Sequence, residues 1–574
     1  MKQIITIIFL LQFLLGFAQI FPHMPKDKKL IILQSSGYFD WAPDLAKNLK
    51  AMQIKRPYIN GVAFHVGPVY GFPNLAFNNE VWTESSLKFS DLSSIASQKT
   101  TLTDNFILVW GHSRNAPPDF FNDNLWAQIV ENTVLLGKAV KAGGCKGIMF
   151  DPEFYSAGET YSPWWYSKSN AKGAPPYTGK SFDLVKAKAR QRGKEYAQAL
   201  QIHMPKITIM TTFLYGYCWD YCYGNINNLP GSEYALLPAF ADGMLEALNP
   251  ESILVDGNET SYYINDSKEY INGNDASYYH VRIEATPKVC DPILLGKWNQ
   301  QGQVAMAPYL DYCYNRYFPN NWSNPAYQSQ WMTHNIYNSL LAADQYVWTY
   351  IEGMNFWTGA NAPANVDVSS DFETAVKKFR NDEALGYDMY NTGNGASQFI
   401  TIPAVNITTP ANNTVINAAG DITITADVNP TSSITKVEFY ANSLKIGEKL
   451  TAPYSITKSF LKADYTIFAR VFRTDGTHNS SSPIHLITRI VTGNYQTENS
   501  SSSIIYPNPV QSEIYLLSNG FESSDYEIIS IEGKSLQTGG VNGQVISIDG
   551  LRPGTYFIKI KTDGRETVQS FVKK

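Results

Sequence analysis

Residues 29–393 alternate short apolar, β-branched segments with amphipathic segments of helical period. Strands that are separated by helices pair in parallel, so this alternation predicts repeated βα units. Eight strand-like segments recur, at residues 30–34, 61–66, 106–110, 147–150, 207–212, 253–255, 304–309 and 346–351. Eight strands with intervening helices in about 365 residues predict a (β/α)8 barrel with enlarged loops.

Helix candidates lie between these strands at residues 124–141, 182–203 and 233–248, each followed by Gly or Pro punctuation. An open doubly wound sheet is the alternative fold. That fold normally carries a Gly-rich phosphate-binding turn after its first strand, and residues 34–39 contain no such turn. The barrel is therefore the favoured prediction, over residues 19–395.

The pattern changes after residue 395, where helical periodicity ends and short alternating runs rich in Thr, Ser, Asn and Val begin. About seven strands in residues 402–492 predict a β-sandwich. The runs at 437–442, 446–448 and 452–455 resemble those of bacterial immunoglobulin-like domains that are appended to secreted carbohydrate enzymes. We expect this domain to act as a spacer.

A polar linker at residues 493–503 precedes a third domain, residues 504–574. Its segments 505–510, 531–534 and 551–560, with the terminal 571–574, resemble the C-terminal sorting domain that the type IX secretion system of Bacteroidetes recognises. The resemblance implies the secretion machinery as a partner and either release or attachment at the outer-membrane surface. The fold class predicted for the whole chain is multidomain, an α/β (β/α)8 TIM-like barrel followed by two all-β sandwich domains.

Residues 1–18 have a basic start, an apolar run from 4 to 17 and small residues before Gln19. We expect a cleaved signal peptide and export through the periplasm, because the run is shorter than the roughly 20 residues of a spanning helix. Five cysteines follow, at 145, 218, 222, 290 and 313, so at least one stays unpaired in an exported protein. We expect buried thiols or one loop disulfide between Cys218 and Cys222.

The 46 basic and 51 acidic residues give a net charge of −5, which excludes a general attraction for nucleic acid. Aromatic residues reach 13%, more ring surface than an average core needs, so some rings should line a binding surface. The motifs of zinc proteases, P-loop proteins and serine hydrolases are missing from the sequence. We expect a monomer that needs no cofactor.

Carboxylates follow several of the predicted strands at the end where barrel active sites form. Asp151 and Glu153 follow the fourth strand and, two residues apart, project to the same side. Further acids follow the sixth, seventh and eighth strands: Asp256, Glu259, Asp311 and Glu352. Glycoside hydrolysis needs one carboxylic acid and one carboxylate, so this pattern predicts sugar chemistry.

Aromatic and histidine side chains at or just beyond predicted strand ends are expected to bind the sugar. They are Trp41, His65, Trp110, His112, Trp164, Trp165, Tyr309, Trp348 and Trp357. Asp311, after the seventh strand, is expected to bind the sugar as well. Among these, the Trp164-Trp165 pair is the favoured substrate platform, because consecutive large rings cannot all enter one core.

The secreted barrel with acids after a middle and a late strand resembles the superfamily of retaining (β/α)8 glycoside hydrolases. That superfamily presents Asn-Glu after the fourth strand and its nucleophile after the seventh, whereas this chain has Asp151-Pro152-Glu153 and Glu352 after the eighth. Another barrel group uses acids after the fourth and sixth strands. The nucleophile and the stereochemistry therefore stay open.

Glu153 is the expected general acid, because Pro152 fixes the backbone before it. The apolar neighbours Phe154 and Tyr155 would also raise its pKa by disfavouring the ionised form. Glu259 or Glu352 would then be the nucleophile or base. Asp151 and Asp256 are expected to orient or tune the pair.

Two other functions stay possible from the sequence. One is a glycan-binding protein without catalysis. The other is a lyase or metal-dependent hydrolase acting on an acidic glycan, with Arg114, Arg190 or Arg316 in the cleft, and with Asp151, Glu153 and Asp256 as candidate ligands of a divalent metal.

Overall fold

The computed structural model describes residues 28–573 apart from several segments. These are residues 35–40, 68–73, 115–117, 154–161, 168–176, 265, 272–275, 314–327, 363–367, 392–396, 401–403, 417–419, 430, 461–462, 477, 489–504, 507–509, 517–524, 531–533, 542–544 and 563–564. The chain forms two compact units, Met1–Arg489 and Ile490–Lys574. The expected signal peptide at 1–18 lies outside the described residues.

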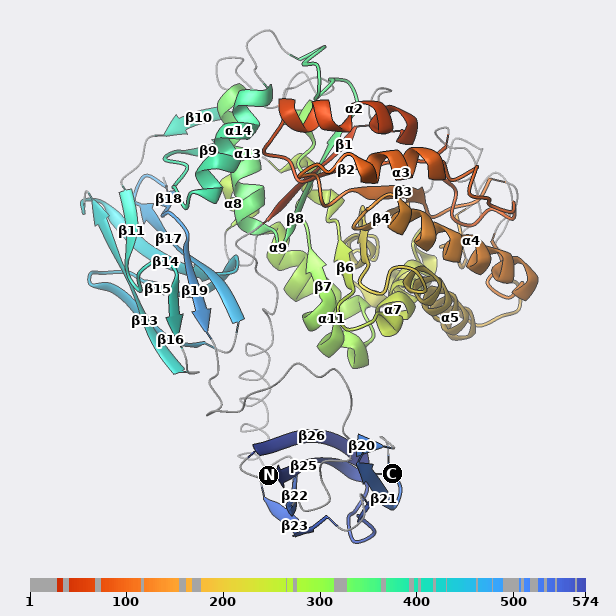
Figure 1. Cartoon of the computed structure of the whole chain (residues 1–574). Helices are drawn as coiled ribbons and strands as arrows, with labels where there is room; N and C mark the ends of the chain where they lie inside the picture. Colours follow the sequence, from red (N-terminus) through yellow and green to blue (C-terminus); the bar gives the residue numbers. More distant parts are fainter. Residues whose placement is uncertain are drawn as a thin grey trace. The chain divides into compact units, whose positions relative to one another are not determined.

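The first unit contains an eight-stranded parallel sheet in the order β7-β6-β5-β4-β3-β2-β1-β8 (Figure 1). Its strands are β1 Lys29–Gln34, β2 Gly61–Phe64, β3 Phe106–Trp110, β4 Gly147–Asp151, β5 Thr208–Thr211, β6 Ile253–Asp256, β7 Gly302–Val304 and β8 Tyr346–Ile351. The residues after β7 bridge to β8 in parallel at Met306–Val347 and Tyr309–Tyr350, so the ring of strands closes there. The predicted barrel is confirmed, and the doubly wound sheet is excluded.

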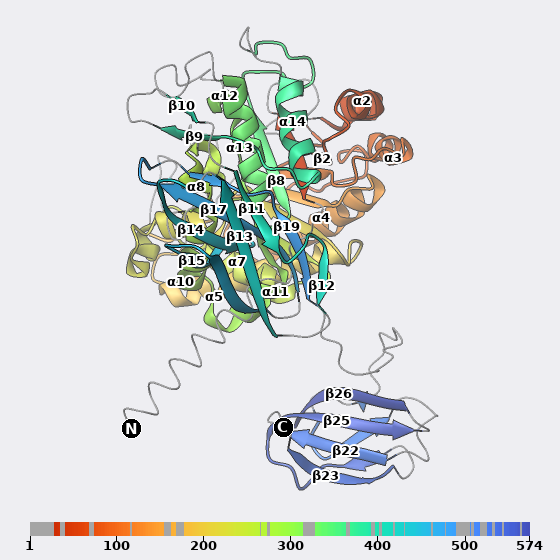
Figure 2. The same cartoon turned by 90° about the vertical axis from the view of Figure 1, so that its left-hand side faces the viewer.

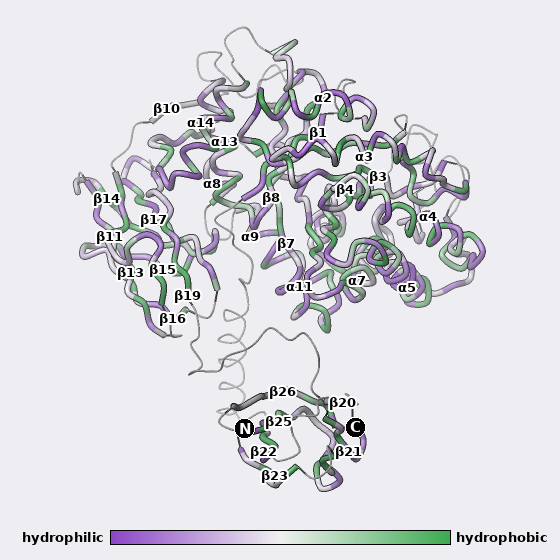
Figure 3. Tube along the Cα trace, in the orientation of Figure 1, coloured by the Kyte–Doolittle hydropathy of each residue, from purple (hydrophilic) through white to green (hydrophobic). Residues whose placement is uncertain are grey.

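Alternate residues of each strand face opposite sides of the barrel wall. In β1, Ile31 and Leu33 belong to the interior cluster, whereas Leu30 and Ile32 pack against the outer helices. Hydrophobic and hydrophilic residues likewise alternate along those helices (Figure 3). The longer helices are α2 Ala42–Lys55, α3 Phe89–Ser97, α4 Asp123–Ala142, α5 Phe182–Gln201, α7 Leu237–Ala247, α11 Leu295–Gln301, α13 Gln328–Ala342 and α14 Val368–Arg380.

The predicted helices agree with α4, α5 and α7, which begin at local signals. The side chains of Asn122 and Ser181 cap α4 and α5, and a Pro opens α7. The seventh strand was predicted at 304–309 but forms at Gly302–Val304, because the later residues make only single bridges.

Short helices occupy several of the enlarged loops. They are α6 Tyr215–Asp220, η1 Ile226–Gly231, η2 Glu259–Tyr263, α8 Ser267–Tyr270, α9 Ser277–Tyr279, η4 His280–Ala285, α10 Thr286–Val289, η5 Pro292–Leu294 and α12 Leu310–Cys313. Two of them, α6 and η2, follow β5 and β6 directly and carry residues of the candidate site.

A hairpin of β9 Asp388–Asn391 and β10 Ser397–Ile400 follows the barrel, and a two-sheet sandwich comes next. One sheet contains β11 Ala404–Thr409, β13 Gly420–Asn429 and β16 Tyr454–Phe460. The other contains β12 Thr414–Ile416, β14 Ile434–Ala441, β15 Leu444–Lys449, β17 Ala463–Arg473, β18 His478–Ser480 and β19 Ile484–Thr488. Their inner faces form one apolar core, as expected for a sandwich.

The second unit is a smaller sandwich of two antiparallel sheets (Figure 2). One is made of β20 Ile505–Tyr506, β21 Glu513–Leu516 and β24 Val545–Ser547. The other is made of β22 Asp525–Ser530, β23 Ser535–Gly540, β25 Gly554–Thr562 and β26 Arg565–Lys573. It has its own core, which includes Val510, Ile528 and Phe571.

Cys145, Cys218, Cys222 and Cys290 are buried free thiols. The structure therefore does not form the loop disulfide that the Cys218–Cys222 spacing allowed. Within the described ranges, no helix combines the length and apolarity that crossing a bilayer requires.

Candidate active site

The end of β4 places two acids at the mouth of the barrel. Asp151 is the last residue of the strand and is buried, while Glu153 is half-buried. Oδ1 of Asp151 accepts the backbone N–H of Glu153 at 2.9 Å and the hydroxyl of Thr212 at 3.0 Å. Asp151 therefore fixes the turn that presents Glu153.

Glu259 begins η2, directly after β6, and its backbone N–H donates to the carbonyl of Thr212 at 3.1 Å. Its Oε2 atom is buried and accepts no hydrogen bond from any described residue. Burial, followed by the charges of Asp151 and Glu153, raises the pKa of Glu259 well above its usual value, and a hydrogen bond with Thr212 offsets this only in part. The acids that follow β4 and β6 thus form one electrostatic cluster.

Asp256, the last residue of β6, supports the cluster from within the wall. Its fully buried carboxylate accepts the backbone N–H groups of Leu214, Gly216 and Asn258 at 3.0–3.1 Å. Burial raises the pKa of Asp256 to about 6, although these hydrogen bonds oppose the shift. Asp256 therefore anchors the start of α6 and the turn before Glu259.

Tyrosines form one side of this cluster. The Tyr217 and Tyr221 rings lie 4.8 Å apart, and Tyr234 packs edge-on against both. The pKa values of Tyr217, Tyr234 and Tyr263 are raised by burial first and by neighbouring groups that include Glu153. Tyr263, at the end of η2, is 51% exposed. These rings provide apolar faces and hydroxyls beside the acids.

Glu352 comes from a different part of the mouth, after β8, and is exposed. Its carboxylate accepts the hydroxyl of Tyr309 at 3.2 Å. Asp311 is buried and accepts the backbone N–H groups of Glu352, Gly353 and Met354 at 2.6–2.9 Å. Asp311 therefore holds the turn after β8, which leaves its carboxylate turned toward the protein rather than a sugar.

Three of the tryptophans predicted to bind sugar are core residues. Trp164 is fully buried among Phe77, Phe150 and Phe240, and its indole N–H donates to the carbonyl of Pro152. Trp348 is fully buried inside the barrel. Trp357 is 3% exposed and packs on Phe356. Trp164 therefore cannot be half of a substrate platform.

The other predicted binding residues vary in exposure. Trp41 is 36% exposed, whereas Trp110, Trp165 and Tyr309 are 6–8% exposed. His65 and His112 are buried, and burial lowers their pKa values to about 4 and about 3, so both are neutral at neutral pH.

The basic and metal-binding alternatives find little support. Arg190 lies on α5 and pairs with Glu246 and Asp291 among the outer helices, so it does not line the mouth. Arg316 lies outside the described residues, and Arg114 is exposed. In the described part of the chain, no three His, Cys, Asp or Glu side chains are grouped to hold a metal ion.

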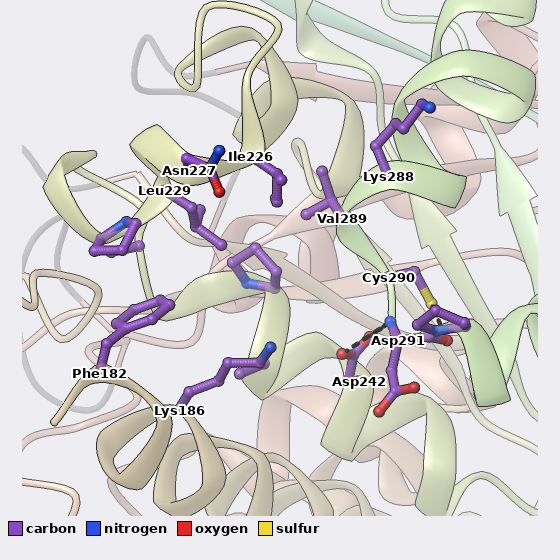
Figure 4. Close-up of a pocket in the computed structure, with 15 residues that line it drawn as sticks. Phe182, Lys186, Ile226, Asn227, Leu229, Asp242, Lys288, Val289, Cys290 and Asp291 are labelled. Carbon is purple, nitrogen blue, oxygen red and sulfur yellow. Dashed lines mark hydrogen bonds between the residues drawn. The ribbon is translucent and has the colours of Figure 1, made fainter.

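A separate pocket of about 470 Å³ opens among the outer helices (Figure 4). It is lined by residues of α5, η1, α7, α10 and η5, including Lys186, Leu229 and Val289. Its buried acid, Asp242, already accepts the hydroxyl of Tyr215 and the backbone N–H of Asp291. Neither Glu153 nor Glu259 lines it.

Sequence reasoning did not identify Thr212, Tyr217, Tyr221, Tyr234 or Tyr263 as site residues. The run 213–223 after the fifth strand, with its five aromatic rings in the first nine residues, was an available signal. Its meaning depends on how α6 brings Tyr217 near Glu153 and Glu259, which the spacing alone does not give.

Two family models match parts of the chain. Residues 403–481 match the model described as a bacterial Ig domain, and residues 504–574 match that of a secretion system C-terminal sorting domain. Both recognitions made from the sequence are confirmed. The sorting domain indicates export, with secretion or attachment at the cell surface. No curated protein matches the chain.

Several solved structures are similar in fold. The endo-β-1,4-mannanase of Thermotoga petrophila is 10% identical, with 81% of this chain and 99% of that chain covered and a TM-score of 0.33. Chitinase ChiA74 of Bacillus thuringiensis is 10% identical, with 96% and 98% covered and a TM-score of 0.31. The fibronectin(III)-like modules of Clostridium thermocellum CbhA are 27% identical over 16% of this chain and 99% of theirs, with a TM-score of 0.15. Such TM-scores, all below 0.5, are too low to assign a role to any residue.

Proposed function

We propose that the chain is a secreted glycoside hydrolase in which Glu153 and Glu259 form the acid–base pair. One observation carries this proposal: Glu259 has a buried, unpartnered carboxyl oxygen and a raised pKa, next to the acids that follow β4. A carboxyl group that keeps its proton beside a second carboxylate is the arrangement that glycoside hydrolysis requires.

In this proposal Glu259 is the general acid. Its proton passes to the glycosidic oxygen as the bond from that oxygen to the anomeric carbon breaks. Glu153 either attacks the anomeric carbon or takes a proton from the attacking water. A carboxyl separation of about 5 Å would give retention, and roughly 6.5–9.5 Å inversion.

The assignment differs from the sequence expectation that Glu153 is the acid. That expectation rested on Pro152, which is described, and on Phe154 and Tyr155, which lie outside the described residues. Burial of Glu259 supports the opposite order, because a low-polarity environment stabilises the protonated form. Asp151 then acts as the residue that orients Glu153.

The site also supports a role for the tyrosines in substrate binding. Tyr217, Tyr221 and Tyr263 are half-buried or exposed near the acids, so a sugar ring could pack on them while its hydroxyls bond to theirs. The sequence expectation placed this role on Trp164, which is in the core.

Turnover on a polysaccharide panel tests the proposal, with the Glu153→Gln, Glu259→Gln and Glu352→Gln variants compared on any substrate found. Glu153→Gln and Glu259→Gln should each lose on the order of 10²-fold or more in kcat. Glu352→Gln is the matched control, since it removes an exposed charge at the same mouth, and it should keep kcat within a few-fold.

Different outcomes of these assays would contradict different parts of the proposed function. A large loss in Glu352→Gln with normal Glu259→Gln turnover would move the pair to Glu153 and Glu352. Tight glycan binding without turnover of any substrate would favour the non-catalytic binding protein.

For the whole chain, we propose signal-peptide removal, passage through the periplasm and export by type IX machinery. Residues 19–395 supply every proposed catalytic group, so a monomer suffices for the reaction.

A further inference from the structure

The immunoglobulin-like sandwich lies next to α8 and β9 of the preceding part of the chain, residues 28–400, which we call the barrel unit (Figure 1). The two meet through a buried polar cluster of five residues. We call it the 388 cluster; it consists of Ser267 of α8, His334 of α13, Asp388 of β9, Arg470 of β17 and His478 of β18. All five are at most 5% exposed. Polar groups buried this deeply are kept by mutual hydrogen bonds, so the cluster requires the two domains to stay together.

Asp388 is the centre of the cluster. Its carboxylate lies 3.1 Å from Nε2 of His334, 3.2 Å from Nε2 of His478 and 3.6 Å from a guanidinium nitrogen of Arg470. Burial alone would raise the pKa of Asp388, but His334, His478 and Arg470 outweigh it and lower the pKa. Burial lowers the pKa of His478 to about 3, so Arg470 is the charged group that the sandwich places beside this buried carboxylate.

Ser267 connects this cluster to the candidate active site. Its hydroxyl lies 2.6 Å from Nε2 of His478 and 3.4 Å from Arg470. Ser267 is the first residue of α8, eight positions after Glu259. The domain contact therefore falls on the segment that carries the proposed acid.

The segment from Glu259 to Ser267 is held by hydrogen bonds at both ends. At Glu259, the backbone N–H bonds to Thr212 of the barrel wall. Between the ends, the carbonyl of Ile264 accepts the Asn335 amide at 3.2 Å and the Tyr270 hydroxyl at 3.4 Å. At Ser267, the hydrogen-bonding partners are His478 and Arg470 of the sandwich.

Apolar contacts agree with a permanent attachment. Tyr440, Leu444 and Phe468 of the sandwich belong to the same buried cluster as the outer core of the barrel. The Ser443 hydroxyl donates to the carbonyl of Leu341 at 3.0 Å. A free-standing domain would leave these surfaces exposed, whereas here they are buried against the barrel.

We propose that the sandwich contributes to catalysis by holding the segment 259–270 in place. His478 and Arg470 are its positioning residues for that segment. The expected effect of His478 and Arg470 on turnover rests on the proposed role of Glu259. Their expected effect on the order of the segment 259–270 does not rest on that role.

The experiment compares two single variants of the full chain, His478→Ala and His485→Ala. Both histidines reach from the sandwich to an aspartate of the barrel unit, because His485 lies 2.9 Å from Asp382. Only His478 also contacts Ser267. His485→Ala is thus the control for general loosening of the domain contact.

Hydrogen exchange of peptides spanning 258–271 is the first measurement. His478→Ala should speed exchange there by about 10-fold, whereas His485→Ala should leave it within 2-fold of wild type. On a confirmed substrate, kcat of His478→Ala should fall by about 10-fold with KM little changed, because a displaced acid affects the reaction more than binding. His478→Gln, which can still form a hydrogen bond with Ser267, should restore part of the slow exchange and part of kcat.

If His478→Ala does not fold, Ser267→Ala removes only the hydroxyl on the barrel side and should speed the same exchange. Unchanged exchange in the folded variant, or equal effects of His478→Ala and His485→Ala, would overturn the proposal. Faster exchange in a protein that hydrolyses no glycan would leave the positioning role intact and reject the proposed function.

Discussion

The hydroxyl of Thr212 donates a 3.0 Å hydrogen bond to Oδ1 of Asp151. The carbonyl of the same threonine accepts the backbone N–H of Glu259 at 3.1 Å. The residue directly after β5 therefore connects the acid at the end of β4 to the acid at the start of η2. The relative position of the proposed pair depends on this neutral side chain as well as on the barrel wall.

Replacing Thr212 with Val keeps the shape and removes the hydroxyl. A hydrogen bond to a charged group contributes about 1.5–3 kcal/mol, so kcat should fall by about 10-fold or more. The matched control is Thr211→Val, whose buried hydroxyl bonds to the carbonyl of Val255 at 2.8 Å on the other side of the wall. Thr211→Val should lower stability but spare kcat in steady-state assays. Equal kcat losses in the two variants would contradict a specific role for Thr212.

The raised pKa of Glu259 predicts a stability effect with a definite sign. In the unfolded chain this group ionises near its ordinary value of 4.5, whereas in the folded protein it ionises at higher pH. Between those two pKa values the folded state binds more protons, so its free energy of unfolding falls as pH rises. Glu259→Gln lacks this titration, so it should gain stability relative to wild type as pH increases from 4.5.

Urea unfolding of both proteins from pH 4 to pH 8 measures this difference. Asp256, with its pKa raised to about 6, is present in both proteins and largely cancels in the comparison. A stability difference that stays constant over this pH range would mean that Glu259 titrates like an exposed glutamate.

The barrel could be predicted from sequence because its signal is local. Ile31 and Leu33 face inward while Leu30 and Ile32 face the helices, and this double-sided burial is visible as a continuous apolar run. The strand ends then locate Asp151, Glu153 and Glu259 at one mouth without any further information. The shortened β7 could not be predicted, because residues after Val304 are as apolar as a strand but pair at single positions only.

The lining of the site was harder to predict. Trp164 and Trp165 are adjacent in sequence, yet Trp164 enters the outer core beside Phe240, a residue 76 positions away. Tyr217 and its neighbour Tyr221 come near the acids because Asp256 of β6 anchors the start of α6. Such long-range contacts determine which ring lies beside the acids, and residue spacing carries no information about them.

The Tyr217–Tyr221 pair should contribute to substrate affinity. Tyr221→Ala removes a half-buried ring that contacts Tyr217 and Tyr234, and aromatic pairs contribute about 0.5–1.5 kcal/mol. We expect KM to rise by about 2- to 10-fold with a smaller change in kcat. Tyr223→Ala is the control, since Tyr223 is two positions away and 88% exposed. An equal rise in KM for Tyr223→Ala would contradict the assignment.

Trp348 should matter for stability rather than for binding. It is fully buried, and its indole N–H donates to the carbonyl of Gly257 at 2.8 Å. Trp348→Phe leaves that carbonyl without its partner and opens space in the barrel, so the free energy of unfolding should fall by about 1–3 kcal/mol. Urea unfolding measures the loss, with Trp41→Phe, at a 36% exposed position, as the control. Weaker glycan binding by Trp348→Phe at unchanged stability would return this residue to the binding site.

Removing the sorting domain should separate export from catalysis. Residues 504–574 match the sorting-domain model and lie in a unit that has its own core. Deleting them should leave the melting temperature of the first unit and its turnover unchanged, because none of the proposed catalytic groups is lost.

In a host with type IX machinery, the truncated protein should accumulate in the periplasm, whereas the full chain should reach the medium or the cell surface. Fractionation followed by immunoblotting measures both, and a folded, full-length Glu259→Gln variant serves as the control because it keeps the sorting domain. Normal export of the truncated protein would show that residues 504–574 are not the export signal.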